Sequence, residues 1–232
     1  MKYERFITLH QVTRVFPGPE PVYALNGVSL SLARGAFVLL EGPSGSGKTT
    51  LLGILGALDR PTSGRVTVDG VEIAGRGASW LAAFRRRRVG FVFQDFRLLE
   101  SLTAQENVAL ALQIGGCRGS EATRRAAAVL VQLGLDRRRH RRPAQLSAGE
   151  RQRVAVARAA VDRRPLILAD EPTANLDSAS GQEVARLLRT LVEEEGITVV
   201  VASHDWRLEK FADTVIRLED GAVVNEEERS CG

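Results

Sequence analysis

The segment that most constrains the fold is EGPSGSGKTTLL, which matches G-x-x-x-x-G-K-[ST] from Gly42 to Thr49 and follows an apolar run around Phe37. Glycines let the backbone wrap closely enough for several N–H groups to point at phosphate oxygens at the start of a helix. Lys48 adds a point charge, and Thr49 offers a hydroxyl to Mg²⁺. The spacing favours a phosphate-binding loop over an ordinary glycine turn. The predicted phosphate-binding residues are Gly42, Pro43, Ser44, Gly45, Ser46, Gly47, Lys48, Thr49 and Thr50.

The order of apolar runs indicates an α/β fold. Short runs rich in valine, isoleucine, leucine or phenylalanine are typical of parallel strands buried on both faces. Segments with helical spacing separate them, and in TTLLGILGALD we expect Leu51, Leu55 and Leu58 to share a face with Ile54. The predicted parallel strands lie near Phe37, Val89, Leu166 and Thr198.

Two further segments, RVTVDGVEI and IRLEDGAVV, place Asp-Gly between β-prone runs, which is a strong hairpin signal. They predict a small antiparallel β-subdomain beside the parallel core. Between Leu102 and Pro143 the chain is rich in alanine, leucine and arginine and lacks strand signals. We therefore predict one domain over residues 1–232, with a helical subdomain inserted at about residues 95–160.

Length and composition fit a globular domain, since the chain has 232 residues and 44% of them are hydrophobic. No apolar run approaches the roughly 18 residues of a membrane span, and MKYERFITLH carries charges where a signal core would be apolar. We expect a soluble, cytosolic protein. Cys117 and Cys231 lie far apart without metal-ligand spacing, so both are expected to be reduced.

The net charge of +4 raises the question of an anionic partner. Only three of the 32 basic residues are lysines, a skew more typical of genomic base composition than of a phosphate-binding face. The runs at Arg85–Arg88 and Arg137–Arg142 are interpreted as solvated helix ends, with a partner surface as the alternative. Aromatic residues make up 5% of the chain, too few to stack single-stranded bases, so no nucleic acid is expected.

Polar side chains follow three of the predicted strands, at the sheet edge where such folds bind ligands. Asp170 ends LILAD and is suited to hold the metal, and Glu171 is suited to act as general base toward water. Acidic pairs also simply end strands, but the phosphate loop favours the catalytic interpretation. Gln94 is expected to sense Mg²⁺ and water, and His204 to contact the γ-phosphate rather than to serve a structural role.

With these residues in place, the sequence resembles the nucleotide-binding subunit of ATP-binding cassette (ABC) transporters over nearly its whole length. Residues 42–49 resemble the phosphate loop, LSAGE at residues 146–150 the signature segment, and ANLD the D-loop ending at Asp177. The resemblance also assigns Gln94 to the Q-loop and His204 to the switch histidine. It implies a P-loop ATPase that uses ATP and Mg²⁺, with Thr49, Gln94 and Asp170 as metal-site residues.

The resemblance further implies a head-to-tail homodimer, in which ATP on one subunit is closed by the signature segment of the other. Ser147 and Glu150 match a helix capping box, and Ser147 and Gly149 would also contact the γ-phosphate across the interface. Asp177 would couple the two sites. Phe16 matches the position that stacks on adenine, with Tyr23 as its rival.

Within that family, the chain resembles the branch of lipoprotein-releasing, macrolide-exporting and cell-division ATPases. This implies a membrane permease as partner, docked near Gln94 and the helical insert, at the cytoplasmic face of a bacterial inner membrane. Ala148 and Ala174 stand where glycine is common in the branch, and Ser203 where threonine is common. All three are small, so activity is expected, and a negative φ would make the Ala148 methyl group harmless.

Two other functions stay open at the sequence level. A soluble ABC ATPase acting on DNA or ribosomes would carry long coiled coils or two cassettes, whereas this chain has a single phosphate loop and no sustained heptads. A cell-division scaffold that signals through ATP without transport is not distinguished by the sequence.

Overall fold

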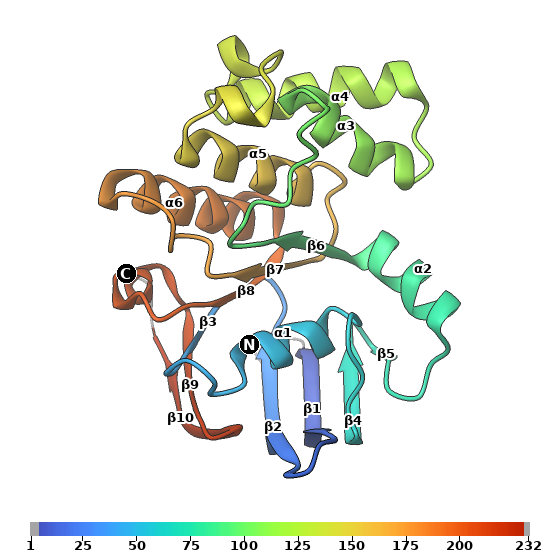
Figure 1. Cartoon of the computed structure of the whole chain (residues 1–232), viewed down its shortest axis with the longest axis vertical. Coiled ribbons are helices and arrows are strands. Elements are labelled where there is room, and N and C mark those ends of the chain that lie inside the picture. Colours follow the sequence, from blue (N-terminus) through green and yellow to red (C-terminus); the bar gives the residue numbers. More distant parts are fainter. Residues whose placement is uncertain (1–4, 230–232) are drawn as a thin grey trace.

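The computed structural model describes residues 5–229, which form two sheets with helices between and around them (Figure 1). Within these residues no helix is both long and apolar enough to cross a membrane. The predicted α/β class is confirmed. The larger sheet contains, in spatial order, β10 (Ala222–Glu228), β9 (Thr214–Glu219), β3 (Phe37–Glu41), β8 (Thr198–Ala202), β7 (Leu166–Asp170) and β6 (Val89–Val92).

The four predicted apolar runs form the parallel centre of this sheet. β3 pairs with β8, β8 with β7 and β7 with β6, all in parallel. The strands are short and nearly all their residues are buried, as expected when helices cover both faces of a sheet. Because parallel strands end at the same edge, the residues that follow β3, β6, β7 and β8 gather there.

The smaller sheet is antiparallel, in the order β2 (Val22–Ala33), β1 (Arg5–Phe16), β4 (Ser63–Val68) and β5 (Val71–Glu72). The turn between β4 and β5 has positive φ at both Asp69 and Gly70, which is the backbone that an Asp-Gly hairpin requires. The first predicted hairpin is therefore confirmed. The long strands β1 and β2 were not predicted, because several irregularities in their pairing break the alternation of buried and exposed residues.

The second predicted hairpin forms, but it lies in the other sheet. β9 and β10 pair antiparallel around Asp220 and Gly221. β9 also pairs in parallel with β3, so this hairpin extends the larger sheet and is not part of the antiparallel one. Val215, Ile216 and Leu218 of β9 are all buried, a pattern that suits a strand inside a two-sided sheet better than an exposed hairpin.

Helix α1 (Lys48–Leu55) follows the phosphate loop and packs between the two sheets (Figure 1). Leu51, Ile54 and Leu55 are buried as predicted, but the helix ends sooner than its spacing indicated. At Gly56 an added Cβ would lie 2.2 Å from the ring of Phe91, and the chain turns away there. Leu58 consequently lies outside the shared face, with 54% of its surface exposed.

The remaining helices enclose the sheets on other sides. α2 (Ala78–Arg88) joins β5 to β6, and α6 (Ser178–Glu195) packs on the face of the larger sheet opposite α1. α3 (Ala104–Ile114), α4 (Gly119–Gln132) and α5 (Ala148–Ala160) form a helical layer with its own buried cluster (Figure 1). Short 3₁₀ turns complete the chain at η1 (Asp136–Arg138), η2 (Pro143–Gln145) and η3 (Trp206–Phe211).

The arginine runs are more than solvated ends. Arg85–Arg88 fill the last turn of α2 as expected, yet Arg85 donates to the carbonyl of Ala57 and Arg88 pairs with Asp69. In the second run, Arg138 pairs with Glu150 at 2.7 Å. These contacts tie neighbouring segments together. Cys117 is a free thiol, and Cys231 lies outside the described residues.

Candidate nucleotide site

The phosphate loop lies between β3 and α1 with a backbone that depends on glycine at two positions. Gly42 has φ 150° and Gly47 φ 104°. A Cβ atom would lie 2.1 Å from the Leu218 carbonyl at the first position and 2.4 Å from the Ala24 carbonyl at the second. A side chain at either position would clash with backbone atoms, so the loop keeps its curvature only with glycine at residues 42 and 47.

Two polar side chains of the phosphate loop, Ser46 and Lys48, are buried. The hydroxyl of Ser46 is buried and has no hydrogen-bond partner among the described residues. Lys48 is also buried, and its Nζ donates to the carbonyls of Gly42 at 2.7 Å and Pro43 at 2.8 Å. Buried polar atoms normally have partners, and a buried lysine whose partners are two neutral carbonyls is suited to an anionic ligand.

Thr49 and Asp170 meet at the edge of this loop although they lie on different elements. Thr49 Oγ1 donates to Asp170 Oδ1 at 3.1 Å. Burial raises the pKa of Asp170, as does the nearby Glu171, while the Thr49 hydrogen bond and the charges of Lys48 and Arg97 lower it, leaving a net increase. A bound cation would favour the ionised carboxylate and offset that burial.

Glu171 and His204 are in direct contact. The Nδ1 atom of His204 lies 2.8 Å from Glu171 Oε1, and the hydroxyl of Ser203 donates to Oε2 at 2.9 Å. Glu171 has φ 46°, an unusual left-handed backbone for a glutamate. The predicted base and the predicted histidine therefore form one unit at the ends of β7 and β8.

A cavity of about 520 Å³, here called the nucleotide cleft, opens in front of these groups. Its volume is in the range typical of small-molecule sites. Asp170 lines a smaller neighbouring cavity that shares Thr49 with it. The nucleotide cleft is lined by Phe16, Val22, Ala24, Ser44, Gly45, Gly47, Lys48, Thr49, Thr50, Gln94, Glu171, Ala174 and His204.

Phe16, rather than Tyr23, supplies the aromatic ring of the cleft. The Phe16 ring lies in the lining and is 40% exposed, whereas Tyr23 is 58% exposed and outside it. The guanidinium of Arg14 lies 4.4 Å from the Phe16 ring centre, and its Nε donates to Asp59 at 2.9 Å. One cationic side chain is thus held over the ring by a carboxylate.

The signature segment lies away from the nucleotide cleft of its own chain. Ser147 caps α5 and accepts from the N–H of Glu150, whose carboxylate accepts from the Ser147 N–H, so the predicted capping box is present. Ala148 begins the helix without a positive φ, and its methyl group is therefore harmless. Gly149 faces α6, since an added Cβ would lie 2.9 Å from Ser180 Oγ.

Asp177, the last predicted site residue, caps α6. Its carboxylate accepts from the N–H groups of Ala179 and Ser180 and from the Ser180 hydroxyl. The Ser180 hydrogen bonds lower the pKa of Asp177. Like Ser147 and Gly149, Asp177 is absent from the cleft lining.

Comparison with known proteins identifies this arrangement. Residues 25–174, more than half of the chain, match the family described as ABC transporter. The chain belongs to the ABC transporter ATP-binding family. It is an ATPase, because a similar solved cassette is described as a dimeric post-hydrolysis state bound to ADP and Pi.

The cassette has similar relatives of different lengths. It is 45% identical over 226 residues to the uncharacterized ABC transporter ATP-binding protein MJ0796 of Methanocaldococcus jannaschii, covering 95% of this chain and 96% of that one. It is 45% identical over 211 residues to the macrolide export ATP-binding/permease protein MacB of Syntrophobacter fumaroxidans, covering 90% of this chain but 30% of that protein. The chain thus spans less than a third of that longer relative.

The fold of the cassette agrees with solved structures. The MJ0796 dimer with ADP and Pi superposes with a TM-score of 0.90 at 43% sequence identity, over 97% of this chain and 99% of that one. CbiO1 from Clostridium perfringens, described as part of the complex cbiONQ, gives a TM-score of 0.86 at 26% identity, over 97% and 89% of the two chains.

Sequence reasoning missed several residues of the cassette that the structure brings to the site. Arg14 and Asp59 support Phe16, and the side-chain amide of Asn175 donates to the Gln94 carbonyl at 3.0 Å. Val22 and Ala24 line the cleft from β2. The Asn175 contact joins segments that are remote in sequence, and the only sequence signal for it is the position of ANLD shortly after Asp170 and Glu171.

Proposed function

We propose that two copies of the cassette close head to tail around two ATP molecules, each bound by the phosphate loop of one copy and the signature segment of the other. The observation that carries this proposal is the split site: Ser147, Gly149 and Asp177 lie outside the nucleotide cleft, while the phosphate loop and Glu171 lie within it. The capped start of α5 is a positive helix end suited to a phosphate. The MJ0796 cassette bound to ADP and Pi is described as dimeric, which supports a dimer for this chain.

The residues present also fit Mg²⁺. No cluster of three or more histidine, cysteine or acidic side chains within residues 5–229 is arranged to hold a metal. Mg²⁺ usually takes one or two protein oxygens, waters and substrate phosphates, which matches the Thr49 hydroxyl and Asp170 carboxylate at 3.1 Å, with Gln94 nearby in the cleft. When bound, it would neutralise charge on the β- and γ-phosphates.

Each side chain of the cleft has a distinct proposed role. Lys48 exchanges its two loop carbonyls for phosphate oxygens when ATP enters, because a cation gains more from an anion than from neutral acceptors. Glu171 accepts a proton from the attacking water, and His204 holds Glu171 Oε1 and reaches the γ-phosphate. Phe16 stacks on adenine with the ring face that Arg14 leaves free.

The Glu171→Gln variant tests the dimer and the role of the base together. Its amide cannot accept the proton, so turnover should fall at least 100-fold while ATP binding persists. Gel filtration should then show a dimer that forms when ATP is added and is absent from the nucleotide-free variant. An ATP-loaded variant that stays monomeric, alone and with its permease, would contradict the sandwich.

We further propose that the cassette powers a membrane permease from the cytoplasmic face of a bacterial-type inner membrane. The permease would use ATP-driven closure of the cassettes for export or for mechanical transmission. The name of the MacB relatives, macrolide export ATP-binding/permease protein, joins an ATP-binding part to a permease, which supports a permease partner for this chain. Fractionation tests the location: the chain should pellet with membranes only when its permease is co-expressed.

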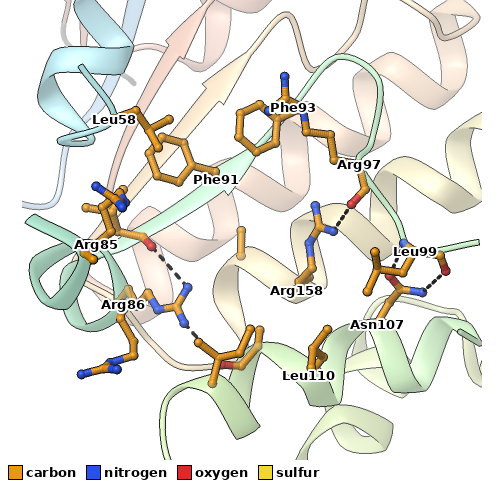
Figure 2. A pocket seen from close by; sticks show the side chains of 16 residues that line it. Leu58, Arg85, Arg86, Phe91, Phe93, Arg97, Leu99, Asn107, Leu110 and Arg158 are labelled. Carbon is orange, nitrogen blue, oxygen red and sulfur yellow. Dashed lines mark hydrogen bonds between the residues drawn. The ribbon is translucent and has the colours of Figure 1, made fainter. Parts of the chain in front are cut away.

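The proposed docking site is a groove of about 470 Å³ between the parallel sheet and the helical layer, here called the subdomain groove (Figure 2). Most of the residues that line it are apolar, and three of these, Leu58, Leu99 and Ile114, are each about half exposed. Large exposed apolar side chains gathered in one groove are typical of a partner site.

The charge of the subdomain groove indicates which kind of permease segment would bind there. Five arginines line the subdomain groove and no acidic side chain does, although Asp95 and Asp162 pair with two of these arginines from outside it. We therefore propose that the occupant is a short amphipathic helix of the permease that carries acidic side chains. The lining arginines are Arg85, Arg86, Arg97, Arg158 and Arg164.

Charge reversal at neighbouring residues of α2 tests this docking. Arg86 lines the subdomain groove, whereas Arg87 next to it, which is also exposed, does not. We expect Arg86→Glu to lower affinity for the permease about tenfold or more and Arg87→Glu to change it less than threefold, measured with purified complexes in low salt. Equal losses in the two variants would contradict the proposed site.

A further inference from the structure

The backbone of Glu171 is held in an unfavourable conformation by contacts from the end of β8. Its φ of 46° places it in the left-handed region, which few residues other than glycine, asparagine and aspartate adopt. Its N–H donates to the Ala202 carbonyl at 2.8 Å, and its two carboxylate oxygens contact Ser203 and His204. A residue in such a conformation persists only where its surroundings over-determine it.

Ser203 is the most enclosed of these partners. It is fully buried, and its own N–H donates to the Leu40 carbonyl at 3.0 Å, so β3 fixes its backbone. His204, in contrast, has a side chain that is 71% exposed. The contact of Ser203 with Glu171 Oε2 is therefore the rigid one, and the contact of His204 with Oε1 is free to change when nucleotide enters.

The direction of the serine hydrogen bond follows from its partners. The Ser203 hydroxyl accepts from the Asp205 N–H at 3.2 Å, and it has one proton of its own to donate. That proton goes to Glu171 Oε2 at 2.9 Å. Oε2 is thereby engaged from the buried side, and Oε1 is left toward His204 and the nucleotide cleft.

We propose that Ser203 is a positioning residue for hydrolysis: its buried hydroxyl binds Glu171 Oε2 and thereby directs Oε1 of the same carboxylate toward the attacking water. The proposal rests on the proposed role of Glu171 as general base. Ser203 itself is fully buried and does not line the nucleotide cleft. It acts by narrowing the orientations of a carboxylate that must be aligned when the proton moves.

Three variants of the full chain test this role by steady-state ATPase kinetics and thermal unfolding. Ser203→Ala removes the donor and should lower kcat about tenfold or more while KM for MgATP changes less than threefold. Ser203→Thr retains the hydroxyl and should restore kcat to within about threefold of the unmodified chain. Ser203→Cys fills the same space with a weak donor and should fall between them, which provides a second measurement if the alanine variant does not fold.

Thr173→Val is the matched control, because Thr173 is buried and its hydroxyl donates to Asp205, in the loop that contains Ser203, at 3.3 Å and not to the Glu171 carboxylate. It should leave kcat within about twofold. Ser203→Ala turnover close to that of the unmodified chain, equal losses in Ser203→Ala and Thr173→Val, or a threonine variant as slow as the alanine variant would each overturn the proposal. A Glu171→Gln variant that still turns over would instead overturn the role of the base, so the two failures are distinguishable.

Discussion

At the scale of single residues, the chemistry of the cleft depends on groups that are costly to bury in the absence of nucleotide. The ammonium of Lys48 has only loop carbonyls as partners within residues 5–229, and the buried Ser46 hydroxyl has no partner among the same residues. Asp170 has a raised pKa for the same reason, burial. Functional sites commonly keep such unfavourable groups, because the ligand supplies the missing partners.

Asp170→Asn should therefore stabilise the nucleotide-free fold. A raised folded-state pKa means that the contribution of Asp170 to stability is present at acid pH and is lost as pH rises through that pKa. Near neutral pH the asparagine variant should melt higher, on the order of 1–3 °C for a chain of this size, and the gap should close at about pH 4 and below.

Thermal melts with and without MgATP check this prediction. MgATP should raise the melting temperature of the unmodified chain more than that of Asp170→Asn, because only the carboxylate gains a cation partner. The variant should also lose hydrolysis. A variant that melts lower than the unmodified chain at neutral pH would show that the burial of Asp170 is not unfavourable.

Residues close in sequence were the ones that could be predicted. The phosphate loop reveals itself by spacing, and Asp170 and Glu171 by their place at the end of an apolar run. The contacts of Arg14, Asn175 and Ser203 could not be predicted, because each depends on how remote segments meet in space. The left-handed backbone of Glu171, whose carboxylate accepts from Ser203, likewise has no local signal in the sequence.

At the scale of elements, the predictions held where hydrophobic patterns are continuous. Four apolar runs became the parallel strands, and both Asp-Gly turns became hairpins. β1 and β2 were missed because bulges interrupt the alternation of buried and exposed residues along them. The β9–β10 hairpin was placed in the wrong sheet because a turn sequence does not specify which further strand, here β3, pairs with the hairpin. The early end of α1 reflects the contact between Gly56 and Phe91, which spacing within the helix does not contain.

One arginine joins the helical layer to the segment that follows Gln94. Arg158 of α5 donates to the carbonyls of Phe96, at 2.8 Å, and Arg97. Both of these residues have positive φ, 61° and 45°. A single half-buried guanidinium therefore holds a strained turn on the path between the nucleotide cleft and the subdomain groove, and Figure 2 shows its contact with Arg97.

Arg158→Met should leave both carbonyls without this partner and reduce the free energy of unfolding by about 1–3 kcal/mol. Urea unfolding followed by circular dichroism measures the change. The control is Arg124→Met on the exposed face of α4, which removes only an i,i+3 pair with Glu121 and should cost less than about 1 kcal/mol. Equal effects of the two substitutions would mean that the Arg158 contacts contribute little.

At the scale of the whole molecule, the position of the signature segment has the largest consequence. Within one chain, α5 begins with its own capping box and contacts α6 through Gly149, and neither Ser147 nor Gly149 lines the cleft. If each ATP site is built from two chains, two defective chains can together form one intact site, which is impossible if the site lies within one chain. Two inactive variants, each defective in a different half, should complement each other when mixed.

Ser147→Arg places a bulky cation at the start of α5 and should block hydrolysis without weakening ATP binding to the monomer. Lys48→Ala should lose the phosphate contact and also be inactive. In an equimolar mixture, half of the dimers are mixed, and each pairs one intact phosphate loop with one intact signature segment, so ATPase activity should return to at most about a quarter of the unmodified level. Each variant alone, at the same total concentration, is the control. Tags of different size on the two variants show whether mixed dimers form. If mixed dimers form and the mixture is no more active than either variant alone, the site is not shared between two chains.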